Sequence, residues 1–521
     1  MLRTVNYLLG CIFSALVFSN ISGAYLEPPI LRLSLEHEPV TFDWNNHRSG
    51  TDRFIISFLM RGLLKYDSAA KLVCDLCQTY TRSADGKILW FDLKSNEVWS
   101  DGVVLEAKHF VDSFMRFLNP SKHFNFPDDF KLIVGAMQSG PKWDPAKVGV
   151  RAVSKHKLEI ILSKPLPVFP HLLTTVAAFP IRKEFFKQSS DKTAEEHAMK
   201  AVLGPYRLAA WEKGRRIVIE GNDKFLGERP VYRVEFILGS HPQHLSRFKA
   251  GKIDILSNPT TEDVLEIPGG AMQVSPYWAT RALMLNAAKP VMTEKGLRKA
   301  LLYALDRDAL PAFLRNGERR VTGIIPPGIA GYRELPLVTT DLGRAKLERK
   351  RVSNAADGVI LRLLTINTET EQRLANWLSE QFGRIQINLQ TVTKDPGAYY
   401  KELEAGRFDI ALVTLPLSIA SPHEVFRSFQ GGAASNFCKC KWENDTFDAL
   451  MEQLYLLSPN QKQPLSEADL WDRLSQILEV ESVALIPLTY PIHSFLLGKR
   501  VLSFSTTPFG DPDLVKIKLR R

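Results

Sequence analysis

Alternating strand and helix patterns between residues 359 and 414 constrain the fold of this chain more than any other feature. Apolar residues alternate from Val359 to Ile366, as in a half-buried strand, and recur at helical spacing from Glu371 to Phe382. The pattern continues as strand, helix and strand over Ile385 to Val392, Tyr399 to Ala405 and Phe408 to Thr414. This succession predicts an α/β domain.

The N-terminus has the pattern of a secretory signal peptide. Arg3 supplies a positive charge, Tyr7 to Phe18 is an apolar run, and Ser22-Gly23-Ala24 offers small residues for cleavage. We therefore expect residues 1–24 to be removed and the mature chain to be exported. Leu8-Leu9-Gly10-Cys11 also resembles a lipoprotein box. Because Cys11 falls inside the apolar run, lipid anchoring there is the minor alternative.

Length and charge fit a globular protein of two or three domains. Cleavage after residue 24 leaves 521 − 24 = 497 residues, and loss of Arg3 lowers the net charge from +10 to +9. The densest basic cluster, Arg344 to Arg351, has helical spacing that predicts a solvated helix with Ala345 and Leu347 facing inward. No basic stripe is interleaved with aromatic residues, so we expect no nucleic-acid partner.

The mature chain has four cysteines, in Cys74-x-x-Cys77 and Cys438-x-Cys440. An exported protein permits disulfides, and structural thiols or a disulfide are the favoured interpretation. A redox pair and a zinc site stay open as alternatives. The first lacks the helix-starting context that lowers a thiol pKa, and the second has no histidine at ligand spacing.

The stretch from Val98 to Gly102, Val-Trp-Ser-Asp-Gly, joins a strand to a helix. Leu89, Phe91 and Leu93 alternate before it, and an apolar stripe from Phe110 to Leu118 follows. Ser100 has no base at readable spacing and no G-x-S-x-G elbow. Asp101-Gly102 therefore predicts a turn and not a reactive pair.

Motifs of metal, nucleotide and nucleophilic chemistry are missing from the sequence. There is no H-E-x-x-H, no Gly-Lys phosphate loop and no G-x-G-x-x-G after a strand. His241-x-x-His244 has ligand spacing on a helix, but no third ligand is nearby, so surface histidines are the simpler interpretation. We expect no metal, no cofactor and no catalytic residue.

Several blocks, in order, resemble the peptide-type (family 5) solute-binding proteins of ABC importers, which include the oligopeptide- and dipeptide-binding proteins. The block from Phe91 to Gly102 is similar to that family's F-x-L-R … W-S-D-G signature. Further matching blocks are Leu203 to Leu208 (LGPYRL), Gly251 to Asp254, Leu285 to Arg307, Ile325 to Gly328 and Gly406 to Asp409. Together they cover nearly the whole mature chain.

The resemblance implies a two-lobed, periplasmic-binding-protein-like α/β fold with an inserted subdomain, an interlobe cleft and two hinge crossings. Lobe I would comprise 25–65, the inserted subdomain 66–177, then 178–276 and 491–521, and lobe II would be 277–490. It further implies a periplasmic, monomeric protein that binds a peptide or peptide-like solute and delivers it to permease subunits in the inner membrane.

The ligand-binding residues implied by the resemblance depart from the family pattern. Peptide-binding members carry an Asp, which pairs with the ligand's α-ammonium, where this chain has Ser418; Pro416 lacks an N–H, and Arg48 stands where an acidic residue can precede ligand-contacting backbone. These features predict a blocked, modified or cell-wall-type peptide, or a non-peptide anion. The expected ligand-binding residues are Arg48, Ser49, Gly50, Tyr277, Trp278, Thr414, Leu415, Pro416, Leu417 and Ser418.

Two other function classes stay open. One is an exported enzyme or a thiol-redox protein that uses Cys74 and Cys77. The other is a solute sensor or chaperone on the same fold, which hands its ligand to a receptor and not to a permease.

Overall fold

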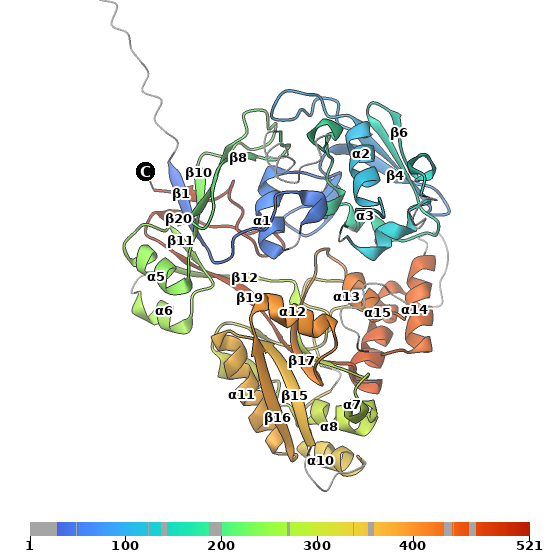
Figure 1. Cartoon of the computed structure of the whole chain (residues 1–521), viewed down its shortest axis with the longest axis vertical. Coiled ribbons are helices and arrows are strands. Elements are labelled where there is room, and N and C mark those ends of the chain that lie inside the picture. Colours follow the sequence, from blue (N-terminus) through green and yellow to red (C-terminus); the bar gives the residue numbers. More distant parts are fainter. Residues whose placement is uncertain are drawn as a thin grey trace, which may run out of the picture.

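The computed structural model (Figure 1) describes residues 29–47, 49–122, 124, 126–136, 143–186, 201–267, 271–336, 338–352, 359–431, 440, 442–457 and 465–520. The predicted signal peptide, Cys11, Arg48 and Cys438 lie outside these ranges. Within them, no helix combines the length and the apolar character that crossing a membrane requires.

Lobe I contains a seven-stranded sheet in the order β12-β19-β11-β1-β10-β9-β8. Its centre is β1, which pairs in parallel with β10 and β11, while the outer pairs are antiparallel. The strands are β1 (Ile30–Leu35), β8 (Tyr206–Glu212), β9 (Arg216–Gly221), β10 (Arg233–Leu238), β11 (Ile255–Ser257), β12 (Ala271–Pro276) and β19 (Ile492–Leu497). The helices α1 (Gly50–Leu59), α5 (His241–Lys249) and α6 (Thr261–Glu266) belong to this lobe.

A second antiparallel sheet, β4-β5-β7-β6, forms a subdomain beside the first. Its strands are β4 (Cys77–Arg82), β5 (Ile88–Leu93), β6 (Val150–Ser154) and β7 (Lys157–Ile161), and the hairpin of β2 (Leu64–Tyr66) and β3 (Leu72–Cys74) precedes them. The helix α2 (Ala107–Phe117) packs on it, with Phe110, Phe114 and Phe117 fully buried, which confirms the predicted apolar stripe. The short helices η2 (Asp128–Leu132), α3 (Phe169–Leu172) and η5 (Val176–Ala178) complete this region.

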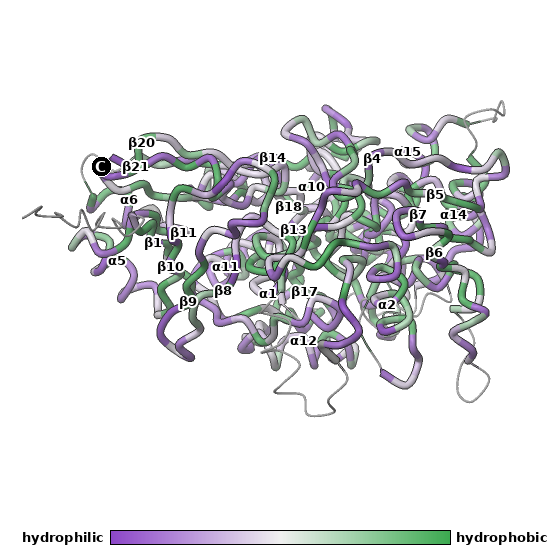
Figure 2. Tube along the Cα trace, turned by 90° about the horizontal axis from the view of Figure 1, so that it is seen from above, coloured by the Kyte–Doolittle hydropathy of each residue, from purple (hydrophilic) through white to green (hydrophobic). Residues whose placement is uncertain are grey.

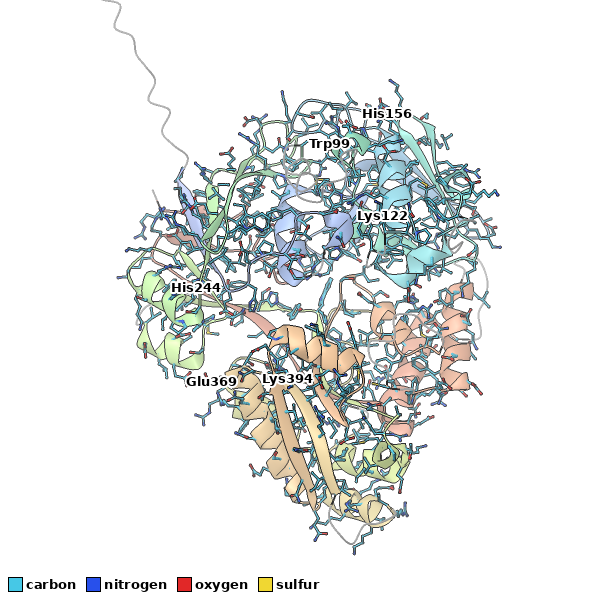
Figure 3. All side chains as sticks on the ribbon, in the orientation of Figure 1. Trp99, Lys122, His156, His244, Glu369 and Lys394 are labelled. Atoms are coloured by element: carbon cyan, nitrogen blue, oxygen red, sulfur yellow. A yellow bond between two sulfur atoms is a disulfide. The ribbon has the colours of Figure 1, made fainter. Side chains whose placement is uncertain are left out.

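The predicted turn after Trp99 is confirmed. Gly102 has a φ of +89°, which a glycine adopts without strain, and Asp101 Oδ1 accepts from Val103 N at 3.2 Å. Ser100 Oγ accepts from Val202 N at 3.0 Å, and Asp101 pairs with Arg182. Figure 3 places Trp99 inside lobe I, away from the boundary between the lobes. This signature is structural.

Lobe II is built on a six-stranded sheet in the order β14-β18-β13-β17-β15-β16. Its strands are β13 (Ala279–Leu285), β14 (Arg319–Arg320), β15 (Val359–Ile366), β16 (Ile387–Lys394), β17 (Ile410–Pro416) and β18 (Leu485–Tyr490). The parallel pairs β15–β16 and β15–β17 confirm the predicted α/β succession. Figure 2 shows the hydrophobic stretches along the strands and the hydrophilic ones mostly along outer loops.

Both faces of this sheet are buried. Along β13, Ala282 and Met284 join one hydrophobic cluster, while Leu283 and Leu285 join the other, as a period of two requires. One face is covered by α7 (Pro290–Thr293), α8 (Lys295–Ala304), α9 (Leu310–Leu314), α10 (Leu342–Lys350) and α11 (Glu369–Gly383). The other is covered by α12 (Pro396–Glu404), α13 (His423–Arg427), α14 (Asp445–Leu456) and α15 (Glu467–Gln476).

The chain passes between the two large sheets twice. It leaves the lobe I sheet after β12 and enters lobe II at β13, through Tyr277 and Trp278. It returns from β18 to β19 through Pro491, and the hairpin of β20 (Val501–Ser503) and β21 (Lys518–Leu519) ends the chain in lobe I. The two-lobed α/β architecture with two hinge crossings is therefore as expected.

Two local expectations were wrong. In α10, Ala345 is buried as predicted, but Leu347 is 52% exposed and Arg349 is buried instead. Apolar residues also recur at helical spacing from Asp52 to Leu64, which predicts a helix over that range, but α1 ends at Leu59 and Leu64 begins β2. Apolar spacing continued across the helix end because the following segment is also buried in lobe I.

Candidate functional site

A cavity of about 550 Å³ lies where the two lobes meet. Lobe I contributes residues of α1, η2 and η5 and the segment from Thr507 to Asp511. Lobe II contributes the end of β17 and the helix α13, which Figure 1 shows facing the subdomain of lobe I. The volume falls within the roughly 300–1,000 Å³ of small-molecule sites.

Part of the cavity wall is aromatic. On the lobe I side, Phe54 and Phe58 of α1 pack edge to face with ring centroids 5.0 Å apart, and Phe126 and Phe179 also line the space. Phe509 lines it beside Leu415 of lobe II. Such a wall suits an apolar ligand body, because burying apolar surface is favourable by about 25 cal/mol per Å².

Most of the charged groups line the cavity where η2 and α13 face each other. Asp128 and Asp129 face it from η2, and Glu424 and Arg427 face it from α13. Ser418 also lines this cavity, and its N–H and hydroxyl donate to Glu424 Oε2 at 2.9 and 2.8 Å. A carboxylate therefore stands beside the position where the family's Asp is replaced.

A second polar group lies at the hinge side. Arg53 and Asp511 both line the cavity, and His493 Nδ1 lies 3.8 Å from Asp511 Oδ1. Burial raises the pKa of Asp511, and the positive charge of Arg53 only partly opposes this. The ring of His493 in turn lies against Tyr277, with centroids 4.2 Å apart, so the first hinge crossing touches this group.

Hydrogen bonds and ion pairs join the two lobes directly. His423 Nε2 of α13 lies 3.1 Å from Asp129 Oδ2 of η2, and both residues are buried. The Ala420 N–H donates to the Tyr66 hydroxyl at 2.9 Å, and Lys164 pairs with Glu452 at 2.9 Å. The lobes are thus in contact, in a closed arrangement.

The residues expected from the sequence divide into three groups. Leu415, Pro416 and Ser418 line the cavity. A second group lies next to that wall and consists of Thr414, Leu417, Tyr277 and Trp278. The Leu417 N–H donates to Trp278 O at 2.7 Å, and the Trp278 ring packs on Phe509 with ring centroids 5.0 Å apart. Ser49 and Gly50 form the capped start of α1 and do not line the cavity; Arg48 lies outside the described residues.

The sequence does not reveal five charged residues of the cavity: Arg53, Asp128, Asp129, Glu424 and Asp511. None of them stands in a chemical motif, and they come together from four separate segments of the chain. One signal was available for Glu424. It follows Pro422 by two residues, in the first turn of α13, where acidic side chains are favoured by the helix dipole.

Cys74 and Cys77 form a disulfide with a Cα–Cα distance of 5.1 Å, which confirms the favoured interpretation. Cys440 is also disulfide-bonded. Among the described residues, no group of three or more His, Cys, Asp or Glu side chains could hold a metal ion.

The sequence predicted both histidines of α5 at the surface, but only His241 is partly exposed. His244 is fully buried, and Figure 3 shows it in the side of lobe I that carries α5. His241 lies between two carboxylates, with Nε2 2.7 Å from Asp263 Oδ2 and Nδ1 3.3 Å from Glu36 Oε1. The hydrogen bond with Glu36, followed by that with Asp263, raises the pKa of His241 to about 9.

Comparison with known proteins identifies the family. The model of "Bacterial extracellular solute-binding proteins, family 5 Middle" matches residues 71–437, more than half of the chain. The chain belongs to this family. The periplasmic oligopeptide-binding protein OppA of Escherichia coli is 23% identical over 459 residues, with 84% of this chain and 83% of the relative covered. The periplasmic murein peptide-binding protein MppA of the same species is 25% identical, covering 76% and 78%.

Solved structures show the same fold for this solute-binding protein. The crystal structure of Haemophilus influenzae OppA in complex with the peptide RPPGFSPFR superposes with a TM-score of 0.80. The match covers 95% of this chain and 99% of that one, at 18% sequence identity.

Proposed function

We propose that this solute-binding protein captures a peptide or peptide-like solute between its lobes and delivers it to the permease subunits of an ABC importer. In this proposal it works in the periplasm, after signal-peptide cleavage, as a monomer that binds without chemistry. The peptide-binding relatives support the ligand class.

The observation that carries this proposal is the cavity itself. It is lined by residues from both lobes, its wall combines aromatic and charged side chains, and its volume suits a short peptide. Contacts such as that of His423 with Asp129 form only when the lobes meet. A ligand that favours this arrangement therefore favours closure.

Closure would be a hinge motion about the two chain crossings. We propose lobe I as residues 25–65, 178–276 and 491–521 with the inserted subdomain 66–177, and lobe II as 277–490. The ligand contacts would include Leu415, Pro416 and Ser418, while Tyr277, Trp278, Thr414 and Leu417 hold the wall behind them. For Ser49, Gly50 and Arg48, ligand contact stays a prediction.

Titration of refolded protein with a pool of di- to pentapeptides tests the proposal. The purified mature chain is unfolded in guanidinium without reductant, dialysed free of retained ligand and refolded. Native mass spectrometry is then expected to show one bound peptide per chain, and the peptide released from the protein should have an unchanged mass. Failure of every pool member to bind would reject the function, and a hydrolysed or oxidised product would favour the enzyme alternative.

A further inference from the structure

Four buried side-chain atoms at the wall of the cavity lack hydrogen-bond partners in the described part of the chain. They are Asp128 Oδ2, Asp129 Oδ1, Arg427 Nε and Thr507 Oγ1. Polar atoms that are buried without a partner are rare in folded proteins and weaken the state that buries them. Two of the four, Asp128 Oδ2 and Asp129 Oδ1, are acceptors, and their position at the cavity wall indicates that a hydrogen-bond donor of a ligand completes them.

The two aspartates are held by their other oxygens. Asp129, 5% exposed, has Oδ2 3.1 Å from His423 Nε2, and Asp128 pairs through Oδ1 with Lys131. Arg427 Nε lies 3.6 Å from Asp129 Oδ1, too far for a hydrogen bond. Each aspartate is therefore anchored in place with one acceptor oxygen left over.

Of the charged cavity-lining residues on η2 and α13, three are carboxylates and one, Arg427, is a cation, so a positive ligand group is favoured there. Asp128 and Asp129 of lobe I stand with Glu424 of lobe II at the cavity, and Glu424 has no cationic partner within the described residues. Burial alone would raise the pKa of Asp129, but His423, Arg427 and Lys164 outweigh it and lower the pKa, so the carboxylate is charged at neutral pH.

We propose that the part of the cavity between η2 and α13 is a subsite for a cationic ligand group with several N–H donors, recognised by Asp128 and Asp129. A hydroxyl offers one proton, whereas an ammonium offers three and a guanidinium five, enough to reach two acceptor oxygens. The apolar body of the same ligand lies along Phe54, Phe58 and Phe126.

The subsite rests on the proposed peptide-binding function, and a peptide supplies the cation from its amino terminus or from a basic side chain. A terminally blocked peptide with a basic side chain satisfies the subsite as well as a free one. A ligand that is only anionic, as Arg48 and Ser418 suggested from the sequence, does not.

Four probes separate the two sources of charge: Lys-Phe-Ala, norleucine-Phe-Ala and their N-acetylated forms. Calorimetry on the refolded wild type is expected to find at least one cationic probe about 10- to 100-fold tighter than acetyl-norleucine-Phe-Ala, as loss of charge-assisted hydrogen bonds implies. In Asp128→Asn and Asp129→Asn, this preference should fall below about threefold.

Asp92→Asn is the matched control, because Asp92 lies on β5 with its side chain 48% exposed, pairs with Lys157 and does not line the cavity. It should keep the wild-type preference. If Asp129→Asn does not fold because Asp129 is buried, Asp128→Asn still tests the subsite. The comparison of the four probes on the wild type requires no variant at all.

Equal affinity of the wild type for all four probes, or a preference that survives in Asp128→Asn, overturns the subsite. Either result leaves peptide capture intact, because the pool titration detects binding whatever the charge of the peptide. If no pool member binds, both the peptide-binding function and the cationic subsite are rejected.

Discussion

Replacing Tyr66 with phenylalanine removes one hydroxyl from the contact between the lobes. That hydroxyl accepts from the Ala420 N–H at 2.9 Å and lies 2.7 Å from His171 Nδ1. Burial, followed by the charge of Arg82, lowers the pKa of His171 to about 4, so at pH 7 its ring is neutral and Nδ1 can accept the Tyr66 proton. Burial also raises the pKa of Tyr66 to about 12, so the phenol keeps that proton.

The size of the effect follows from these partners. The Tyr66→Phe ring keeps its packing against Trp278 and Phe509, but the Ala420 N–H loses its acceptor in the closed state. Leaving this part-buried donor unpaired costs up to about 1–3 kcal/mol. Since every 1.4 kcal/mol is a factor of ten, the dissociation constant of a ligand bound by the closed form should rise about 5- to 150-fold.

Calorimetry with the tightest peptide of the pool measures this change. Tyr80→Phe is the control, because the Tyr80 ring stacks on Phe91 and its hydroxyl makes no hydrogen bond within the described ranges. It should bind like the wild type. A dissociation constant for Tyr66→Phe within twofold of the wild type, at an unchanged melting temperature, would refute the role of this hydroxyl in closure.

Three further predictions concern stability and the disulfide. Glu36 above all raises the pKa of His241 from 6.5 to about 9, so the charged ring stabilises the fold fully below pH 6.5 and loses this effect as the pH rises through 9. Between pH 7 and 10 the free energy of unfolding should therefore fall by about 1–3 kcal/mol, a range that allows for the partial exposure of the ring. The variant His241→Gln should not show this fall. Gly204→Ala would place a Cβ 2.4 Å from Phe58 O and should cost about 1–3 kcal/mol in denaturant unfolding, whereas Gly383→Ala, with no atom within 4 Å, should not destabilise. The Cys74–Cys77 disulfide joins residues only three positions apart, so its reduction should lower the free energy of unfolding by at most about 2 kcal/mol and leave peptide affinity unchanged. Loss of binding on reduction would favour a redox role.

The local sequence pattern was sufficient to predict an element where its buried side chains recur at regular spacing on one face. The alternation in β15 and the apolar stripe of α2 each specify an element and its buried face, and the structure confirms both. The pattern failed where other forces decide burial. Leu347 is exposed while Arg349 of the same helix is buried, because an arginine can bury its long stem where the tertiary surroundings cover it.

The site could be predicted only in part, for a physical reason. Leu415, Pro416 and Ser418 lie within four residues of one another on one segment, so a resemblance could locate them. Asp129 and Glu424 line the same cavity only when the lobes meet. They are nearly 300 positions apart in the chain, so no local sequence pattern could indicate that they share a site. The Glu424 carboxylate beside Ser418 shows the consequence, since the sequence alone suggested that this part of the cavity had lost its acidic group.

Calorimetric titration of the refolded chain with the tightest peptide of the pool tests the central claim most directly. The account predicts saturable binding of one peptide per chain, with the peptide recovered intact and a higher melting temperature for the complex. No heat of binding and no change in melting temperature with any pool member would contradict it.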